Sequence, residues 1–94
     1  MDAELILRTK SYGSDDTILE MTIWRTPTPV EPSQHHFKYR LVLIHRGKRV
    51  IGFDNERGKG DHRHLAGLET EYEFVSIEKL LDDFERDIEA WSSS

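Results

Sequence analysis

Residues 54–64 bring together side chains that can transfer protons and bind negative charge. The segment reads Asp-Asn-Glu-Arg-Gly-Lys-Gly-Asp-His-Arg-His. His62 and His64 stand two positions apart, so in an extended stretch both imidazoles point to one side and Arg63 to the other. Histidine can act as general base and as general acid near neutral pH. Cleavage of an RNA phosphodiester needs both roles, because the 2′-hydroxyl loses a proton while the departing 5′-oxygen gains one.

Residues around the two histidines can supply the other groups that this reaction needs. Cations stabilise the charge that develops on the phosphorane-like transition state, and glycines let backbone N–H groups approach phosphate oxygens. A carboxylate can orient an imidazole and hold its tautomer. The predicted catalytic residues are His62, His64, Asp61 and Asp54. The predicted substrate-binding residues are Arg57, Lys59, Arg63, Lys38, Arg40, Asn55, Gly58 and Gly60.

The charge of the chain is distributed unevenly along the sequence. The segment from His35 to His64 contains all five histidines and eight lysines or arginines against three acids. It is therefore cationic, although the whole chain of 94 residues has a formal net charge of −5. A local positive field inside an acidic protein is typical of a site for a polyanion, which supports RNA as the substrate.

Other interpretations of the same segment stay open. Asp54, Asp61, His62 and His64 can offer oxygen and nitrogen ligands to a divalent metal, which would make the protein a metal-dependent nuclease or nucleotidyl-modifying enzyme. A basic hairpin can also bind nucleic acid or an acidic protein without any catalysis. A charged, glycine-rich loop is also often only a solvated turn. Over these we favour a metal-independent endoribonuclease that uses no cofactor.

Composition and length narrow the class of protein. There is no cysteine, which excludes disulfides, thiolate catalysis and cysteine-ligated metals. No apolar run approaches the roughly 20 residues that cross a bilayer. Acids at Asp2 and Glu4 do not suit a secretory signal, so a cytoplasmic location without membrane contact is expected. A chain of this length fits one domain, residues 1–94.

The periodicity of apolar residues predicts the elements that position the candidate site. Alternation with a period of two indicates strands, and a proline-rich loop interrupts them at 26–34. Ser76 is a good helix N-cap, and the apolar residues after it repeat at helical spacing. The expected strands are 3–10, 17–25, 36–45, 49–54 and 71–75, with a glycine-punctuated loop from Asp54 through Gly67. The prediction is an α+β fold, a mainly antiparallel sheet of about five strands (two hairpins plus a short strand) with a C-terminal helix packed on one face.

Several aromatic and histidine side chains are assigned to packing or to the surface. Trp24 and Trp91 are expected to anchor the core. His35 and His36 follow the proline-rich loop and are expected at the surface, where a strand begins.

The sequence resembles the TumE family of toxins from bacterial toxin–antitoxin systems. The resemblance rests on Ile23-Trp24-Arg25-Thr26-Pro27, on Phe37-Lys38-Tyr39-Arg40-Leu41 and above all on the run from Val50 to His64. The ending Tyr72-Glu73-Phe74-Val75-Ser76 followed by Leu80-Leu81-Asp82-Asp83-Phe84 is also similar. The resemblance covers nearly the whole chain.

The resemblance implies a small cytoplasmic toxin that arrests growth by attacking RNA or translation. It also implies a cognate antitoxin, typically a helix-turn-helix DNA-binding protein. It does not assign catalytic residues, so the roles given above come from chemistry alone. An exposed edge strand would also permit a homodimer.

Overall fold

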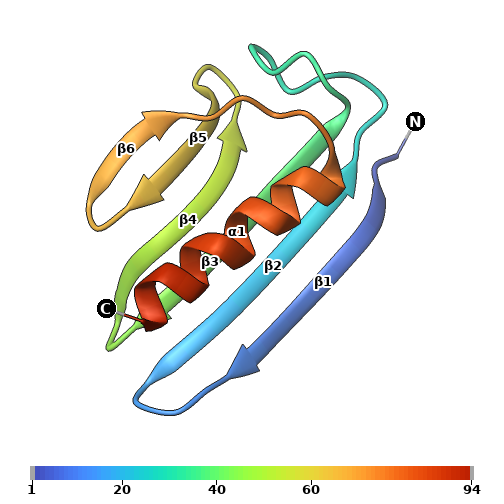
Figure 1. Cartoon of the computed structure of the whole chain (residues 1–94). Helices are drawn as coiled ribbons and strands as arrows, with labels where there is room; N and C mark the ends of the chain where they lie inside the picture. Colours follow the sequence, from blue (N-terminus) through green and yellow to red (C-terminus); the bar gives the residue numbers. More distant parts are fainter. Residues whose placement is uncertain (1, 94) are drawn as a thin grey trace.

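Six strands follow one another across an antiparallel sheet, and one helix lies on one face of it (Figure 1). The computed structural model describes residues 2–93. The elements are β1 (Glu4–Tyr12), β2 (Thr17–Arg25), β3 (Phe37–His45), β4 (Lys48–Glu56), β5 (Gly60–Leu65), β6 (Leu68–Glu71) and α1 (Ile77–Ser92). Each strand pairs with its neighbour in sequence, in the order β1-β2-β3-β4-β5-β6. The predicted α+β class and the C-terminal helix are confirmed.

The region expected to be a loop contains two strands. β4 continues to Glu56, a short turn follows, and β5 and β6 then form a third hairpin. Gly58 and Gly60 have φ angles of +88° and +82°, so these glycines permit the turn that starts β5. The prediction of a strand at 71–75 is wrong, because β6 ends at Glu71 and the chain then leaves the sheet and leads to the helix.

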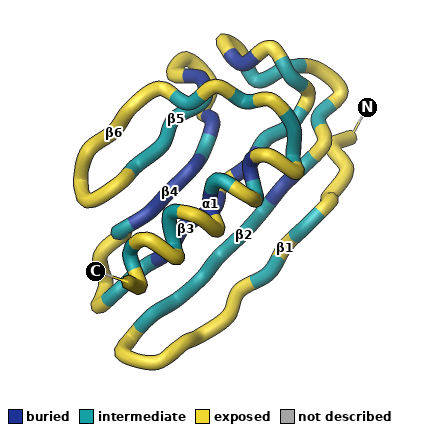
Figure 2. The backbone as a smooth tube through the Cα atoms, viewed as in Figure 1, coloured by how far each residue is buried: buried dark blue, intermediate teal, exposed yellow. Residues whose placement is uncertain are grey.

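The core lies between α1 and the middle of the sheet. Figure 2 shows the buried backbone concentrated in β3, β4 and the facing side of α1. The buried cluster consists of Ile23, Tyr39, Leu41, Leu43, Ile51 and Phe53 from the sheet, with Leu80 and Phe84 from the helix. The helical stripe predicted from sequence is therefore the buried face. Ser76 caps the helix as expected, because its Oγ accepts a hydrogen bond of 3.0 Å from the Lys79 N–H.

The two tryptophans occupy opposite faces of the sheet. Trp91 packs against the core, as predicted. The prediction for Trp24 was wrong: it follows the buried Ile23 in β2, so its side chain points away from α1 and is only partly buried. Within residues 2–93, the single helix is neither long nor apolar enough to span a membrane.

Replacing Phe84 by alanine is expected to lower the free energy of unfolding by about 3–5 kcal/mol. The ring is 2% exposed and meets Phe53 edge to face, with 6.1 Å between centroids, so its removal leaves a cavity in the core. Urea unfolding followed by circular dichroism measures the change. Leu68→Ala is the control, since Leu68 is 67% exposed and its loss should alter stability by less than about 0.5 kcal/mol.

Candidate functional site

On the face of the sheet opposite α1, polar side chains align in a row across all six strands. One row of paired residues runs through Arg8, Thr22, Arg40, Asp54, His62 and Glu71. His64 lies in the next row, between Gly52 of β4 and Glu69 of β6. We call this surface the open face. Both histidines of β5 therefore share one face, as their spacing predicted, and Asp54 lies beside them.

His62 has one engaged nitrogen and one that is not hydrogen-bonded. Its Nε2 lies 2.7 Å from the Lys59 carbonyl oxygen, which can only accept, so Nε2 carries the proton. Its Nδ1 is shielded from solvent, has no hydrogen-bond partner among residues 2–93 and lies 3.3 Å from Oε1 of Glu69. The Lys59 ammonium lies 3.7 Å from the same Glu69 oxygen, so an exposed ion pair flanks this nitrogen. Nδ1 can accept a proton, and Glu69 can stabilise the imidazolium that results.

His64 is held between a cation and a carboxylate. Its Nδ1 accepts a hydrogen bond of 3.0 Å from Nη2 of Arg49, which places the ring proton on Nε2. That Nε2 lies 3.7 Å from Oδ1 of Asp54. A Cβ at Gly52 would come within 3.0 Å of Cδ of Arg49, so the glycine gives the arginine room to reach His64. Arg49 was not among the predicted site residues, because the sequence placed it at the edge of a turn.

The other predicted cations lie on β3 and in the turn before β5. Arg40 and Lys38 are on β3, on the open face, and Arg40 lies 3.3 Å from Oε2 of Glu20. The ammonium of Lys38 donates to the backbone carbonyl of Asn55. Arg57 lies in the exposed turn that leads to β5, next to Gly58.

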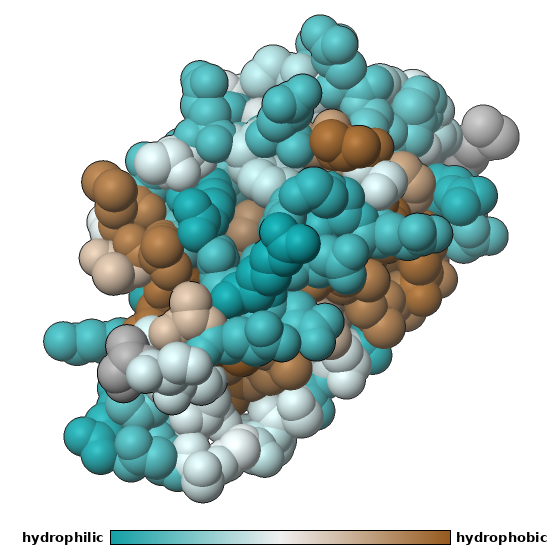
Figure 3. Space-filling model, viewed as in Figure 1, coloured by the Kyte–Doolittle hydropathy of each residue, from teal (hydrophilic) through white to brown (hydrophobic). Residues whose placement is uncertain are grey.

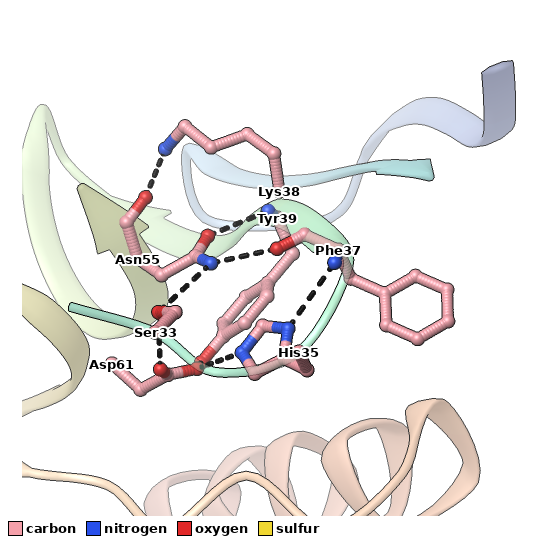
Figure 4. A network of polar contacts seen from close by, with 7 residues as sticks. All are labelled: Ser33, His35, Phe37, Lys38, Tyr39, Asn55 and Asp61. Atoms are coloured by element: carbon pink, nitrogen blue, oxygen red, sulfur yellow. Dashed lines mark hydrogen bonds and ion pairs between the residues drawn. The ribbon is translucent and has the colours of Figure 1, made fainter. Parts of the chain in front are cut away.

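Asp61 lies on the helix side of the sheet (Figure 4). Alternation along β5 places it on the face opposite to His62 and His64. Its Oδ1 accepts a hydrogen bond of 2.5 Å from the Ser33 hydroxyl. Its Oδ2 accepts one of 2.7 Å from Nε2 of His35 and one of 2.6 Å from the Tyr39 hydroxyl. The carboxylate does orient an imidazole, as predicted for its type, but that imidazole belongs to His35.

The polar network around Asp61 is saturated. Nδ1 of His35 accepts the Phe37 N–H, so both nitrogens of this ring are engaged. Asn55, which is fully buried, accepts the Tyr39 N–H at 2.9 Å and donates to the Phe37 carbonyl at 2.7 Å and to the Ser33 hydroxyl at 3.3 Å. The network joins the proline-rich loop to β3, β4 and β5, and a pocket of about 720 Å³ beside it includes these already paired groups. We therefore assign this network to the stability of the structure.

His35 was wrongly predicted to lie at the surface, whereas His36 is exposed as predicted. The His35 side chain is 16% exposed, and its ring stacks on Phe74 with 3.8 Å between centroids. A signal exists in the sequence: Ser33, His35, Phe37 and Tyr39 continue the two-residue alternation of β3 toward the core side.

Arg63 also points to the helix side, as alternation along β5 requires. Its guanidinium makes two hydrogen bonds of 2.8 and 2.7 Å to the carboxylate of Asp87 in α1. These bonds raise the pKa of Arg63. The geometry ties β5 to the helix, so Arg63 fixes the strand that carries the two histidines.

The four residues considered as metal ligands do not converge. Asp54, His62 and His64 are on the open face, whereas Asp61 is on the other. Across residues 2–93, no three His, Cys, Asp or Glu side chains are grouped so that they could hold a metal ion.

Stability is expected to fall above about pH 10, by about 1.4 kcal/mol per pH unit for each of two tyrosines. Burial, assisted by hydrogen bonds to Asp61 and Asp83, raises the pKa of Tyr39 and of Tyr72 in the fold. The unfolded chain therefore releases these protons first, and the stabilisation is lost as the pH rises through the unfolded pKa. Urea unfolding at pH 9, 10 and 11 measures the slope. Tyr39→Phe should remove one tyrosine's share, and an unchanged slope would contradict the assignment.

Comparison with known proteins identifies the family. No curated protein and no solved structure shows a significant match to the chain. A family model described as toxin TumE matches residues 2–92. The match supports a role as a toxin. A toxin of a toxin–antitoxin pair implies an antitoxin as its partner. Because the match spans nearly the whole sequence, the chain belongs to the TumE toxin family.

Proposed function

We propose that this toxin cleaves RNA by metal-independent transesterification, with His62 and His64 as its general base and general acid. The observation that carries the proposal is Nδ1 of His62, a shielded acceptor beside Glu69 that has no hydrogen-bond partner within residues 2–93. Buried polar atoms are normally paired, and a role in proton transfer is one explanation for an unpaired nitrogen. By contrast, the nitrogens of His35 on the helix side are both engaged.

In the proposed reaction, the 2′-hydroxyl attacks the adjacent phosphorus and its proton passes to Nδ1 of His62. Glu69 stabilises the imidazolium, and movement of the exposed Lys59–Glu69 pair gives the substrate access. The bond from phosphorus to the 5′-oxygen breaks, and a protonated His64 supplies the proton to that oxygen. The products are a 2′,3′-cyclic phosphate and a free 5′-hydroxyl, so atoms and charge balance.

Arg49 couples substrate binding to the protonation of His64. In the free protein it donates to Nδ1 of His64, which must therefore be unprotonated. A phosphate oxygen is a stronger acceptor for a guanidinium than an imidazole nitrogen is. A bound phosphate draws Arg49 away, Nδ1 becomes free to take a proton, and Asp54 stabilises the cation that forms.

The remaining residues divide between phosphate binding and support. Lys38, Arg40, Arg57 and Lys59, with the backbone at Gly58 and Gly60, extend the cationic surface for the RNA. Asp61, Asn55 and Arg63 lie on the helix side and act by positioning β5. We further propose that the antitoxin is a helix-turn-helix DNA-binding protein and that toxin and substrate meet in the cytoplasm. Edge strands β1 and β6 would permit a homodimer.

The test is incubation of the purified toxin with a defined single-stranded RNA in the presence of a chelator. The expected result is cleavage with 2′,3′-cyclic phosphate and 5′-hydroxyl ends, and resistance of the same RNA with a 2′-deoxy nucleotide at the cleaved position. Loss of activity with chelator and recovery with a divalent ion would favour the metal-dependent alternative. Salt-sensitive binding without any covalent change would favour a binding module.

A further inference from the structure

Trp24 lies on the open face among cations, which is an unusual position for a large aromatic side chain. The guanidinium carbon of Arg8 lies 5.5 Å from the centroid of its ring. The indole also lines a pocket of about 240 Å³ together with Thr22, Lys38 and Arg40. Lys38 is its direct partner in β3. No part of this arrangement is needed for the core, because the ring points away from α1.

We infer that this pocket binds a nucleobase of single-stranded RNA, an inference that rests on the proposed function and names its substrate class. An indole provides a flat surface on which any base can stack, and neighbouring cations bind the backbone. Arg40 belongs to the same register row as His62, two strands away. Trp24 is on β2, three strands from β5, or about 14 Å at the usual strand spacing. One strand of RNA can therefore place a base on Trp24 and a phosphate near the histidines.

Single-stranded RNA is the form that fits this site. In a duplex the bases are stacked and paired, so no base face is free to lie on an indole. The single helix of residues 2–93 packs on the other face of the sheet, so the open face presents no helix that could enter a groove. The pocket therefore selects against duplexes.

Fluorescence of Trp24 provides the test, because Trp91→Phe leaves it as the single tryptophan. The probe is a ten-nucleotide 2′-O-methyl RNA, which binds but lacks the 2′-hydroxyl needed for cleavage. We expect saturable quenching, about tenfold weaker binding in Trp24→Ala measured by anisotropy of a labelled probe, and a smaller loss in Trp24→Phe. Tyr12→Ala is the matched control, since Tyr12 is exposed and lies beside Lys10.

Unchanged affinity in Trp24→Ala, equal loss in Tyr12→Ala, or equal affinity for duplex and single strand would overturn the inference. Cleavage is measured separately on unmodified RNA. Failure of cleavage would therefore remove the proposed chemistry and leave the binding result standing.

A second inference concerns the helix side, where α1 leaves part of the sheet uncovered. Beside the helix, an apolar groove of about 300 Å³ is lined by Leu19 and Met21 of β2 and by Leu81, Phe84, Glu85 and Ile88 of α1. Figure 3 shows hydrophobic surface along this side of the helix, toward β1.

The charge at the rim of the groove indicates what kind of helix fits. At helical spacing, Glu78, Asp82, Glu85 and Glu89 form one row, and no lysine or arginine belongs to it. All four are exposed. The two basic residues of α1, Lys79 and Arg86, lie on its other flank, toward the side of Asp83 and Asp87. The groove is thus apolar at its floor and acidic along one rim.

We propose that this groove binds an amphipathic helix of the antitoxin, with an apolar face and a basic flank. Family membership implies the antitoxin, and the acidic row complements a basic flank in charge. Binding there leaves the open face exposed, so this proposal is independent of the ribonuclease mechanism.

The test is calorimetric titration of the toxin with its cognate antitoxin. We expect Glu85→Lys to weaken binding about tenfold and Met21→Lys to weaken it further, while Glu73→Lys, an exposed residue outside the groove, has no effect. Circular dichroism checks that each variant is folded. Wild-type affinity in both groove variants, or weakening by Glu73→Lys alone, would overturn the proposal.

Discussion

Replacing His62 or His64 by alanine is expected to slow RNA cleavage by about 100- to 10,000-fold. Each substitution removes one of the two groups that transfer protons in the proposed reaction. Binding of the uncleavable RNA probe should change by less than about threefold, because the cations that contact phosphate remain. Single-turnover cleavage of a labelled RNA measures the rate.

His36→Ala is the matched control for these two variants, since His36 is exposed and lies just before the first residue of β3. It should cleave like the wild type. The pH profile adds a second readout: loss of one histidine should convert a bell-shaped dependence into a single limb. Rates within tenfold of the wild type in both histidine variants, or equal toxicity of all proteins in cells, would end the catalytic assignment.

Asp61→Ala is expected to lower the free energy of unfolding by about 2–4 kcal/mol. The carboxylate accepts three hydrogen bonds from side chains that are themselves buried or half-buried, and alanine would leave those donors unpaired. The loss should also loosen the proline-rich loop, because Ser33 belongs to this loop and His35 follows it directly. Urea unfolding measures the first effect, and amide hydrogen exchange over residues 30–36 measures the second.

Asp54→Ala provides the contrast on the opposite face. Asp54 lies 3.7 Å from Nε2 of His64, and within residues 2–93 its side chain belongs to no hydrogen-bond network. We expect its loss to slow cleavage at least tenfold while stability changes by less than about 1 kcal/mol. The reverse outcome is an unstable Asp54 variant and a stable but inactive Asp61 variant. It would contradict the assignment of Asp54 to catalysis and of Asp61 to stability.

Elements with an apolar face could be predicted from the sequence. Alternation of Leu19, Met21 and Ile23 with polar residues predicted β2, and the helical stripe through Leu80 and Phe84 predicted α1. β5 could not be found in this way. Its residues from Asp61 to His64 are polar on both faces, so the period-two signal has no hydrophobic member.

The candidate site was predicted only in part for a related physical reason. Local spacing alone places His62 and His64 on one face, and the structure agrees. The partners of these residues depend on pairing between distant segments. Asp61 meets His35, 26 residues away, and a register shift between Leu43 and Ile44 accompanies the placement of Arg49 near His64. Alternation along one strand can indicate which face His35 occupies, but it does not indicate which distant residue it meets.

The pairing of each strand with its successor has a consequence for how the chain reaches this structure. Apart from the proline-rich connection between β2 and β3, each hairpin closes a short stretch of chain, so the sheet can assemble with little loss of loop entropy, and such topologies tend to fold fast for their β content. Only α1 must return across the sheet, from beyond β6 to the middle strands. The helix covers the apolar side of the middle strands with Leu80 and Phe84, so the sheet buries its core residues only once α1 has docked.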